Sequence, residues 1–168
     1  FVDLTLPQLS ETDAAGNTRA FSVASAPQES ALMVATRLRD TAFKRELQRM
    51  PLGSTVRMEG SFGKLVLHSD QTRPAVFLAG GIGITPFRSM VVQAAMQRLP
   101  HSIVLFYSNR RPEDAPFLDE LQALQDKNPH YRFVGTMTEP TKSSRPWQGE
   151  TGYLNAALLS KHLVNMEK

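Results

Sequence analysis

The fold of this chain is decided by the stretch Ala75-Val76-Phe77-Leu78-Ala79-Gly80-Gly81-Ile82-Gly83-Ile84-Thr85-Pro86. Its first five residues are all apolar, which is typical of a short strand covered on both faces. The glycines that follow turn the chain and let a ligand approach the backbone closely. Pro86 suits the first turn of a helix, and helix N-termini attract anions. The stretch therefore predicts a phosphate-binding turn; the alternative is a tight strand-to-helix turn without a ligand.

The sequence after this turn alternates between helical and strand periodicity. Apolar side chains recur at helical spacing up to Pro100, and a second all-apolar strand follows at 103–107. Strands that alternate with helices form parallel sheets with right-handed crossovers, so residues 71–168 predict an α/β domain. The further elements that we expect are helices over 87–99, 116–127 and 154–166, a strand over 132–137 and a polar loop over 138–149.

The sequence before residue 71 is typical of antiparallel β structure. Val2, Leu4 and Leu6 alternate with polar residues, as in a strand with one buried face. A change to helical spacing predicts a short helix over 43–50, capped by Asp40 or Thr41. We therefore place a first domain at 1–70, with further strands at 19–25, 32–38, 56–58 and 65–67.

Composition excludes several classes of function. The 168 residues carry a formal net charge of +3 without a run of like charges, so we expect no nucleic-acid partner. No apolar run approaches the roughly 20 residues of a membrane span. The chain has no cysteine for a disulfide or an iron–sulfur cluster, and its four histidines lack the spacing of a metal site. We see no signal peptide and expect a cytoplasmic protein, here as a piece of a longer chain because Phe1 opens within a strand.

Three further groups of polar residues could carry chemistry. Arg19 and Phe21 share one side of a predicted strand, where they could hold a phosphate and stack on a ring; otherwise they lie in solvent and in the core. The helix start at 41–42 could bind an anion or could simply be capped. The third group follows the second and third parallel strands, where α/β sheets bind ligands, unless it is a solvated loop. Its members are Asn109, Arg110, Thr138 and Glu139.

Taken in order, these patterns resemble the ferredoxin–NADP reductase superfamily. The resemblance rests on Arg-x-Phe-Ser-x-x-Ser at 19–25, on Gly60-Ser61-Phe62-Gly63 and on the glycine turn at 80–86, and it covers nearly the whole chain. It implies an antiparallel flavin-binding β-barrel followed by a parallel-sheet nucleotide-binding α/β domain. It also implies that this chain lacks strands of the barrel and the last strand of the α/β domain.

The resemblance implies roles for individual residues. Arg19 would bind a flavin phosphate and Phe21, where the family usually has tyrosine, would pack against the isoalloxazine ring. Ser22, the only residue that we expect to be catalytic, would hydrogen-bond near flavin N5. The other cofactor-binding residues that it implies are Val34, Thr36, Thr41 and Ala42 for the flavin, Gly80, Gly81, Gly83, Thr85 and Pro86 for the nicotinamide nucleotide, and Asn109, Arg110, Thr138 and Glu139 for the adenosine half of that nucleotide.

The activity that the resemblance implies is flavin-dependent NAD(P)H oxidation. A hydride would pass from nicotinamide to flavin, and electrons would then leave to a separate acceptor protein or small acceptor. The expected cofactors are FAD, or FMN in its place, and NADH or NADPH. The Glu139 carboxylate favours NADH because it would repel a 2′-phosphate, whereas Arg110 and Arg111 would attract one. Two alternatives stay open: a nucleotide-binding or regulatory module of the same fold without turnover, and an α/β nucleotide-binding protein without flavin.

Overall fold

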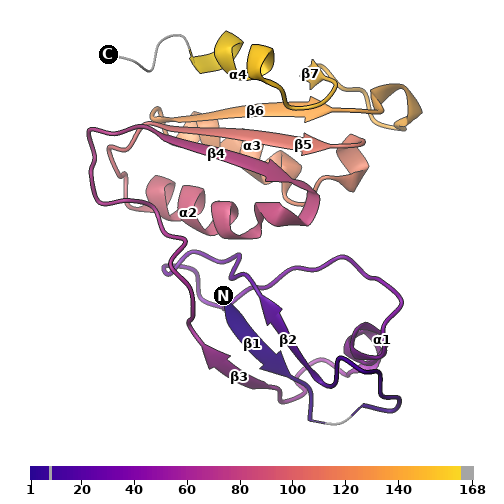
Figure 1. Ribbon diagram of the computed structural model, residues 1–168. Helices are drawn as coiled ribbons and strands as arrows, with labels where there is room; N and C mark the ends of the chain where they lie inside the picture. The colour runs from indigo at the N-terminus through magenta and orange to yellow at the C-terminus, as the bar shows by residue number, and fades with distance from the viewer. Residues whose placement is uncertain (8, 164–168) are drawn as a thin grey trace.

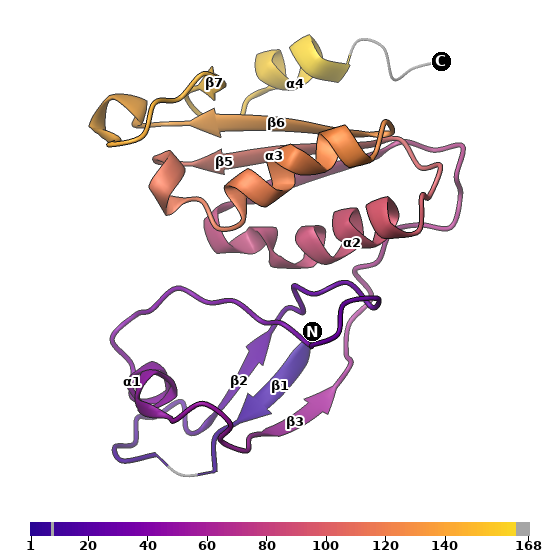
Figure 2. The ribbon, with the colours of Figure 1, turned by 180° about the vertical axis from the view of Figure 1, so that it is seen from behind.

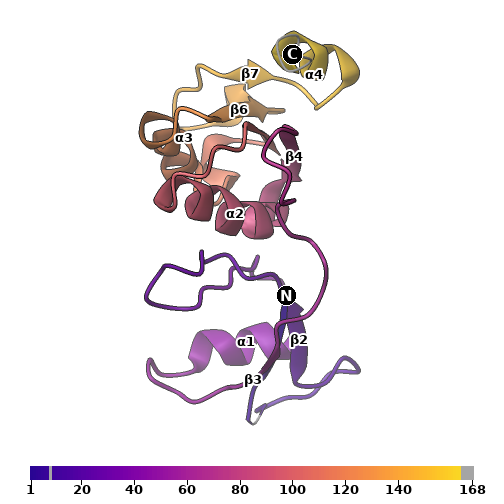
Figure 3. The ribbon, with the colours of Figure 1, turned by 90° about the vertical axis from the view of Figure 1, so that its left-hand side faces the viewer.

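A computed structural model describes residues 1–7 and 9–163, which form two sheets joined by an extended segment (Figure 1). We call residues 1–67 the N-terminal half and residues 75–163 the α/β half. Helix α2 of the α/β half lies between its own sheet and the N-terminal half (Figures 1 and 3). The predicted fold class, antiparallel β structure followed by a parallel α/β unit, is confirmed.

The N-terminal half is an antiparallel sheet of order β2-β1-β3 with one helix. Val2 of the central strand pairs with Phe21 on one side and with Gly60 on the other. The helix begins where the Thr41 side chain accepts the Lys44 N–H at 3.4 Å, as an N-cap does. The elements are β1 (Val2–Thr5), β2 (Thr18–Phe21), α1 (Ala42–Arg49) and β3 (Arg57–Gly60).

The α/β half is a parallel sheet of order β4-β5-β6-β7. The prediction that the strand at 75–79 is covered on both faces is wrong: Val76 and Leu78 are 42% and 50% exposed, because the described part of α4 packs against β5 and β6 and not against β4. Helices α2 and α3 pack on one face and α4 on the other (Figures 2 and 3). The strands are β4 (Ala75–Gly80), β5 (Ile103–Asn109), β6 (Tyr131–Met137) and β7 (Glu150–Thr151). The α-helices are α2 (Thr85–Met96), α3 (Leu118–Lys127) and α4 (Ala156–Leu163), and short 3₁₀ helices span Gly81–Ile84, Pro112–Asp114 and Pro140–Lys142.

Two predicted strands do not form. Over 32–38 there is only a single bridge between Val34 and Val23, and 65–67 has no strand pairing. In both segments apolar side chains such as Leu38 and Leu65 are exposed, and neither segment joins one of the two sheets within the described residues. A period-2 pattern predicts a strand only where a partner can accept its hydrogen bonds. The strand predicted at 19–25 is also shorter than expected and ends at Phe21.

The predicted helices are confirmed with small shifts of their ends. The helix that we expected to reach Met166 is described as far as Leu163, and residues 164–166 lie outside the described residues. Strand β7 went unpredicted, since two residues are too few to display a period. Within the described residues, no helix combines the length and the apolar character that crossing a membrane requires.

Candidate functional site between the two halves

A cavity of about 500 Å³ lies between the two halves of the chain. Its volume falls within the range of small-molecule sites, roughly 300–1,000 Å³. Residues of the Arg-x-Phe-Ser pattern line one side and residues of the glycine turn line the other. We call it the cationic cavity; its lining residues are Arg19, Ala20, Phe21, Ser22, Ala35, Thr36, Lys44, Leu65, Ile82, Gly83, Thr85, Pro86 and Phe87.

Arg19 and Phe21 reach this cavity, but each is held mainly by its own half. The Arg19 guanidinium donates to the carbonyls of Ala15, Gly16 and Thr18 at 2.7–2.8 Å. Phe21 is only 8% exposed and packs against Phe43, with ring centroids 5.9 Å apart. The structure therefore places most of Phe21 in the core, leaving a small part of it to contact a ligand.

The Asp13 carboxylate occupies the place where we expected flavin phosphate contacts. It accepts the Ala42 N–H at 3.2 Å and pairs with Arg19, also at 3.2 Å. Burial opposes ionisation of the Asp13 carboxyl, but the N–H groups of Ala15 and Ala42 and the charge of Arg19 hold its pKa below the usual range. The N–H of Thr41 is also bonded internally, to the carbonyl of Arg39 at 2.9 Å. The sequence could not predict this contact, because Asp13 lies 29 residues before the helix start and only the fold brings the two together.

Lys44 is a cationic residue of the cavity that sequence reasoning missed. It is the third residue of α1 and lines the cavity beside Arg19. Burial lowers the pKa of Lys44, and the charges of Arg39 and Arg19 lower it further. An anion bound in the cavity would relieve this repulsion, so the wall is suited to a phosphate. The signal lay in the sequence as Arg37, Arg39, Lys44 and Arg45, but only the fold shows which of these faces the cavity.

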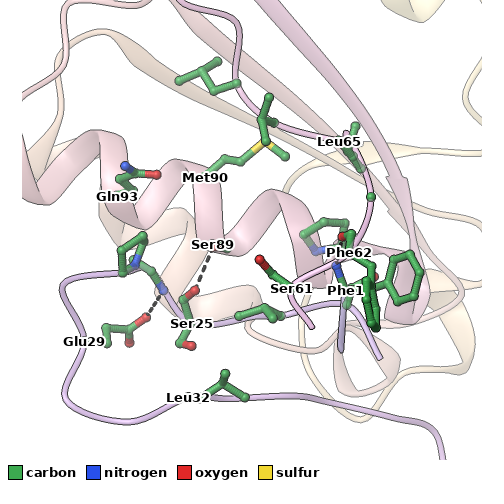
Figure 4. Close-up of a pocket in the computed structure, with 18 of the residues that line it drawn as sticks. Phe1, Ser25, Glu29, Leu32, Ser61, Phe62, Leu65, Ser89, Met90 and Gln93 are labelled. Atoms are coloured by element: carbon green, nitrogen blue, oxygen red, sulfur yellow. Dashed lines mark hydrogen bonds between the residues drawn. The ribbon is translucent and has the colours of Figure 1, made fainter. Parts of the chain in front are cut away.

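Ser22 stands between two cavities. It lines the cationic cavity and also a larger one of about 700 Å³ bounded by Phe1, Phe62 and α2 (Figure 4). Pro86, from the other half, lines both as well. Of the two residues that we expected along the flavin tail, Thr36 lines the cationic cavity, whereas Val34 does not line it: Val34 bridges to Val23 and packs against the core of the N-terminal half.

The glycine turn is organised as a 3₁₀ turn that opens α2. Gly81 has a φ of +52°, which favours glycine, and its carbonyl accepts the Tyr107 hydroxyl at 3.0 Å. Gly80 is the last residue of β4 and directly precedes the turn. A Cβ at Gly83 would meet no atom within 4 Å, so this glycine leaves open space on the cavity side. Thr85 is buried and donates to the Ile82 carbonyl at 3.2 Å, and no side chain caps α2.

The residues expected around the adenosine half form a second group, at the carboxyl ends of β5 and β6. The Thr138 N–H donates to the Asn109 carbonyl at 2.9 Å and the Glu139 N–H to that of Arg110 at 2.8 Å. The Asn109 side chain is 6% exposed, and neither its oxygen nor its nitrogen has a hydrogen-bond partner among the described residues. A buried amide with free donors and acceptors is suited to bind a polar ligand. Glu139 is paired with Lys142 at 3.0 Å.

Comparison with known proteins explains this combination of features. Residues 77–168 match the family described as the oxidoreductase NAD-binding domain. The chain belongs to the ferredoxin reductase-like superfamily. The predicted resemblance is therefore confirmed.

Individual relatives cover both halves of the chain. It is 31% identical over 140 residues to ferredoxin--NADP reductase B of Sorangium cellulosum, covering 82% of this chain and 56% of that protein. It is 26% identical over 126 residues to the terephthalate 1,2-dioxygenase reductase component 1 of Comamonas sp., covering 74% of this chain and 38% of that protein. The chain thus spans about half or less of the length of these relatives.

A solved structure shares the arrangement of both halves. The ferredoxin NADP⁺ reductase of Neisseria gonorrhoeae, a structure with bound FAD and NADP, has a TM-score of 0.67 and 25% sequence identity to this chain. The similarity covers 98% of this chain and 64% of that one. The antiparallel sheet and the α/β unit therefore occur together in a member of the superfamily.

Proposed function

We propose that this chain supplies the flavin and nicotinamide sites of a flavin-dependent NAD(P)H oxidoreductase. One observation carries the proposal: Arg19, Phe21, Ser22 and Thr36 of the N-terminal half line the same cavity as Gly83, Thr85 and Pro86 of the α/β half. These residues were assigned to two different cofactors, and electron transfer between two cofactors requires that their sites meet.

The N-terminal half fits a flavin in shape and in charge. Lys44 and Arg19 form a cationic wall for a phosphate, and Thr36 and the exposed part of Phe21 line the rest of that side. A phosphate that reached the Ala42 N–H would have to displace the Asp13 carboxylate or bind beside it. We propose FAD as the flavin. FMN stays open as the alternative, because nothing in the cavity selects between their phosphate groups.

The α/β half fits a nicotinamide nucleotide along the carboxyl edge of its sheet. The N-terminal turn of α2 offers N–H groups that no side chain caps, beside the open space at Gly83. The buried Asn109 amide and the exposed Arg110 lie further along the same edge, as the adenosine half requires. The Glu139 carboxylate beside them favours NADH, although its pairing with Lys142 reduces its repulsion of a 2′-phosphate.

The protein binds and orients the reactants. A bound flavin supplies the two-electron acceptor for the nicotinamide hydride. Ser22 lines the cationic cavity, and we assign its hydroxyl the hydrogen bond to flavin N5. Pro86 and Phe87 cover the opposite side. The electron acceptor in this proposal is a separate protein or small molecule, as the names of the relatives indicate for ferredoxin and a dioxygenase.

Two further parts of the proposal concern organisation. We place the boundary between a flavin-binding and a nucleotide-binding domain near residue 70, in the segment between the two sheets. We also propose a cytoplasmic location, because NADH and NADPH are supplied there. Cell fractionation tests the location, and limited proteolysis tests the boundary.

Anaerobic titration tests the proposed activity. The protein that carries this chain is loaded with FAD or FMN, freed of unbound flavin, and mixed with NADH or NADPH while its visible absorption is recorded. We expect the yellow flavin colour to be retained and then bleached by the nucleotide. Retained flavin that neither nucleotide bleaches would favour the module without turnover, and failure to retain any flavin would overturn the proposal.

A further inference from the structure

Arg88 on α2 is a buried cation that joins three segments of the chain. It is only 4% exposed, and it lies two residues after Pro86, which lines the cationic cavity. Its Nη atoms donate to the Glu29 carboxylate at 2.9 and 3.0 Å, while Nε and Nη2 donate to Glu120 at 2.8 and 2.5 Å. Nη1 also donates to the Ala24 carbonyl at 2.8 Å. All five donors of a guanidinium are therefore in use.

The groups around Arg88 come from both halves. Ala24 and Glu29 belong to the N-terminal half, whereas Glu120 lies on α3. The face of the guanidinium lies over the Phe117 ring, 5.0 Å from its centroid. Because a guanidinium is planar and its donors are fixed in direction, these contacts define the orientation of each partner.

Contacts beside Arg88 immobilise the same segment of the N-terminal half. The Ser89 hydroxyl donates to the Ser25 carbonyl at 2.7 Å, and the Ala26 N–H donates to Glu29 at 2.6 Å; both bonds are visible in Figure 4. The carbonyls of residues 24 and 25 are thus both bound to α2, directly after the segment that contains Ser22. A shift of α2 relative to this segment would break several bonds at once.

We propose that Arg88 is a positioning residue that fixes the separation between the flavin side and the nicotinamide side of the cationic cavity. The inference rests on the proposed function. Apolar packing of the same volume often stabilises a fold as well as a buried ion network does, so stability alone does not call for these ions, whereas the fixed directions of their hydrogen bonds set the position of α2. Hydride transfer needs the reacting atoms within roughly 3–3.5 Å, and a misplacement of about 1 Å costs on the order of 100-fold in rate.

Two readouts test this role, one of them without cofactors. Because the chain has no cysteine, Leu52→Cys and Gln122→Cys place one spin label on each half at exposed positions. Pulsed electron paramagnetic resonance then measures the distribution of distances between the labels. We expect a narrow distribution in the parent protein and a broad one after Arg88→Met. The kinetic readout is the anaerobic flavin reduction rate at saturating nucleotide, with flavin content and nucleotide affinity measured in parallel.

The expected kinetic result is a reduction rate at least tenfold lower in Arg88→Met, with flavin content and nucleotide affinity within twofold of the parent. Arg45→Met is the matched control, because Arg45 pairs with Glu11 at 2.7 Å entirely within the N-terminal half. It should leave both the distance distribution and the rate unchanged. If Arg88→Met does not fold, Glu29→Gln keeps the side-chain shape, removes one charge, and should broaden the distribution to a smaller extent.

An unchanged distance distribution and an unchanged rate in the folded variant would overturn the inference. So would a loss of rate matched by an equal loss of flavin or nucleotide affinity, which would make Arg88 a binding or folding residue. Failure of the proposed function is distinguishable, because the parent protein itself would then show no nucleotide-dependent bleaching.

Discussion

The two halves of the chain differ in how much of their structure they hold by themselves. In the α/β half, strands β5 and β6 are almost entirely buried, and one core spans the sheet, α2 and α3. The N-terminal half has a core of three buried residues, Leu6, Phe21 and Phe43, and all four residues of β3 are exposed. The comparison indicates that the α/β half is the scaffold of this chain, and that the N-terminal half is held against it by bonds from α2 to the carbonyls of Ala24 and Ser25.

The largest effect is expected when a core residue of the scaffold is truncated. Phe106→Ala removes a fully buried ring from β5 and should lower the free energy of unfolding by about 3–5 kcal/mol. Met58→Ala in the exposed β3, where Met58 is 49% exposed, should change it by no more than about 0.5 kcal/mol. Urea denaturation measures both, and equal effects would contradict the difference in burial between the two halves on which the comparison rests.

The next prediction separates the two sites by altering the nucleotide side alone. Gly83→Val fills open space in the cavity without a strained φ, so the fold should tolerate it. We expect flavin reduction by the nucleotide to slow by roughly 100-fold, because displaced reactants lose that much rate. Flavin content should not change, and Gly83→Ala should have a smaller effect. If Gly83→Val reduced the flavin at the parent rate, the glycine turn would not be part of the nucleotide site.

The corresponding change on the flavin side is Lys44→Gln. A charge-assisted hydrogen bond to phosphate contributes about 1.5–3 kcal/mol, so flavin affinity should fall by roughly 10- to 100-fold. Arg45→Gln on the outer side of α1 is the control and should leave affinity unchanged. Equilibrium titration with flavin measures both variants. Equal affinities for Lys44→Gln and the parent would place the phosphate elsewhere, with Arg19 as the next candidate.

The joint between the halves, by which we mean the Arg88 contacts with Ala24, Glu29 and Glu120, should contribute less to stability in acid. The hydrogen bond from Arg88 holds the pKa of Glu29 below its usual 4.5, and the N–H of Ala26 contributes in the same direction against the effect of burial. A depressed pKa in the folded state stabilises the fold above about pH 4.5, and this contribution is lost as the pH falls through the folded value.

Glu29→Gln should therefore flatten the dependence of stability on pH below about pH 4.5, relative to the parent. Urea midpoints at several pH values measure this difference. Glu46 also has a lowered pKa, caused by hydrogen bonds from Ser10, but it lies within the N-terminal half. Spin-label distances should distinguish the two, since only Glu29→Gln should loosen the joint. An unaltered pH dependence in Glu29→Gln would contradict the assignment of Glu29 to the joint.

The smallest expected effect concerns nucleotide choice at the far end of the scaffold. Glu139→Arg should shift the ratio of kcat/KM values toward NADPH by about two- to fivefold, because charge interactions at an exposed edge contribute about 1 kcal/mol or less. The kcat/KM values for NADH and NADPH are measured on the protein that carries this chain and on the variant. A parent that already prefers NADPH tenfold, and a variant that matches it, would assign selectivity to Arg110 and Arg111.

The sequence predicted the scaffold better than the N-terminal half, for a physical reason. Runs such as Ile103 to Tyr107 are apolar because both faces of the strand are covered. Such a run can be recognised in the strand's own sequence, without knowing which strand lies beside it. A strand with one free face depends on its neighbour, so the pattern at 32–38 predicted pairing that does not occur. The glycine turn and the short helix after Thr41 were predictable because their backbone chemistry is local.

By itself the sequence determined that β4, β5 and β6 are strands of the parallel sheet, where the turn before α2 lies, and which superfamily the chain belongs to. The tertiary structure alone decided which charges meet. Asp13 reaches the start of α1, Lys44 turns to the cavity, and Arg88 draws together carboxylates that are 91 residues apart, Glu29 and Glu120. Short-range dihedral and burial preferences are encoded residue by residue, whereas an ion pair depends on where the folded chain brings two distant side chains.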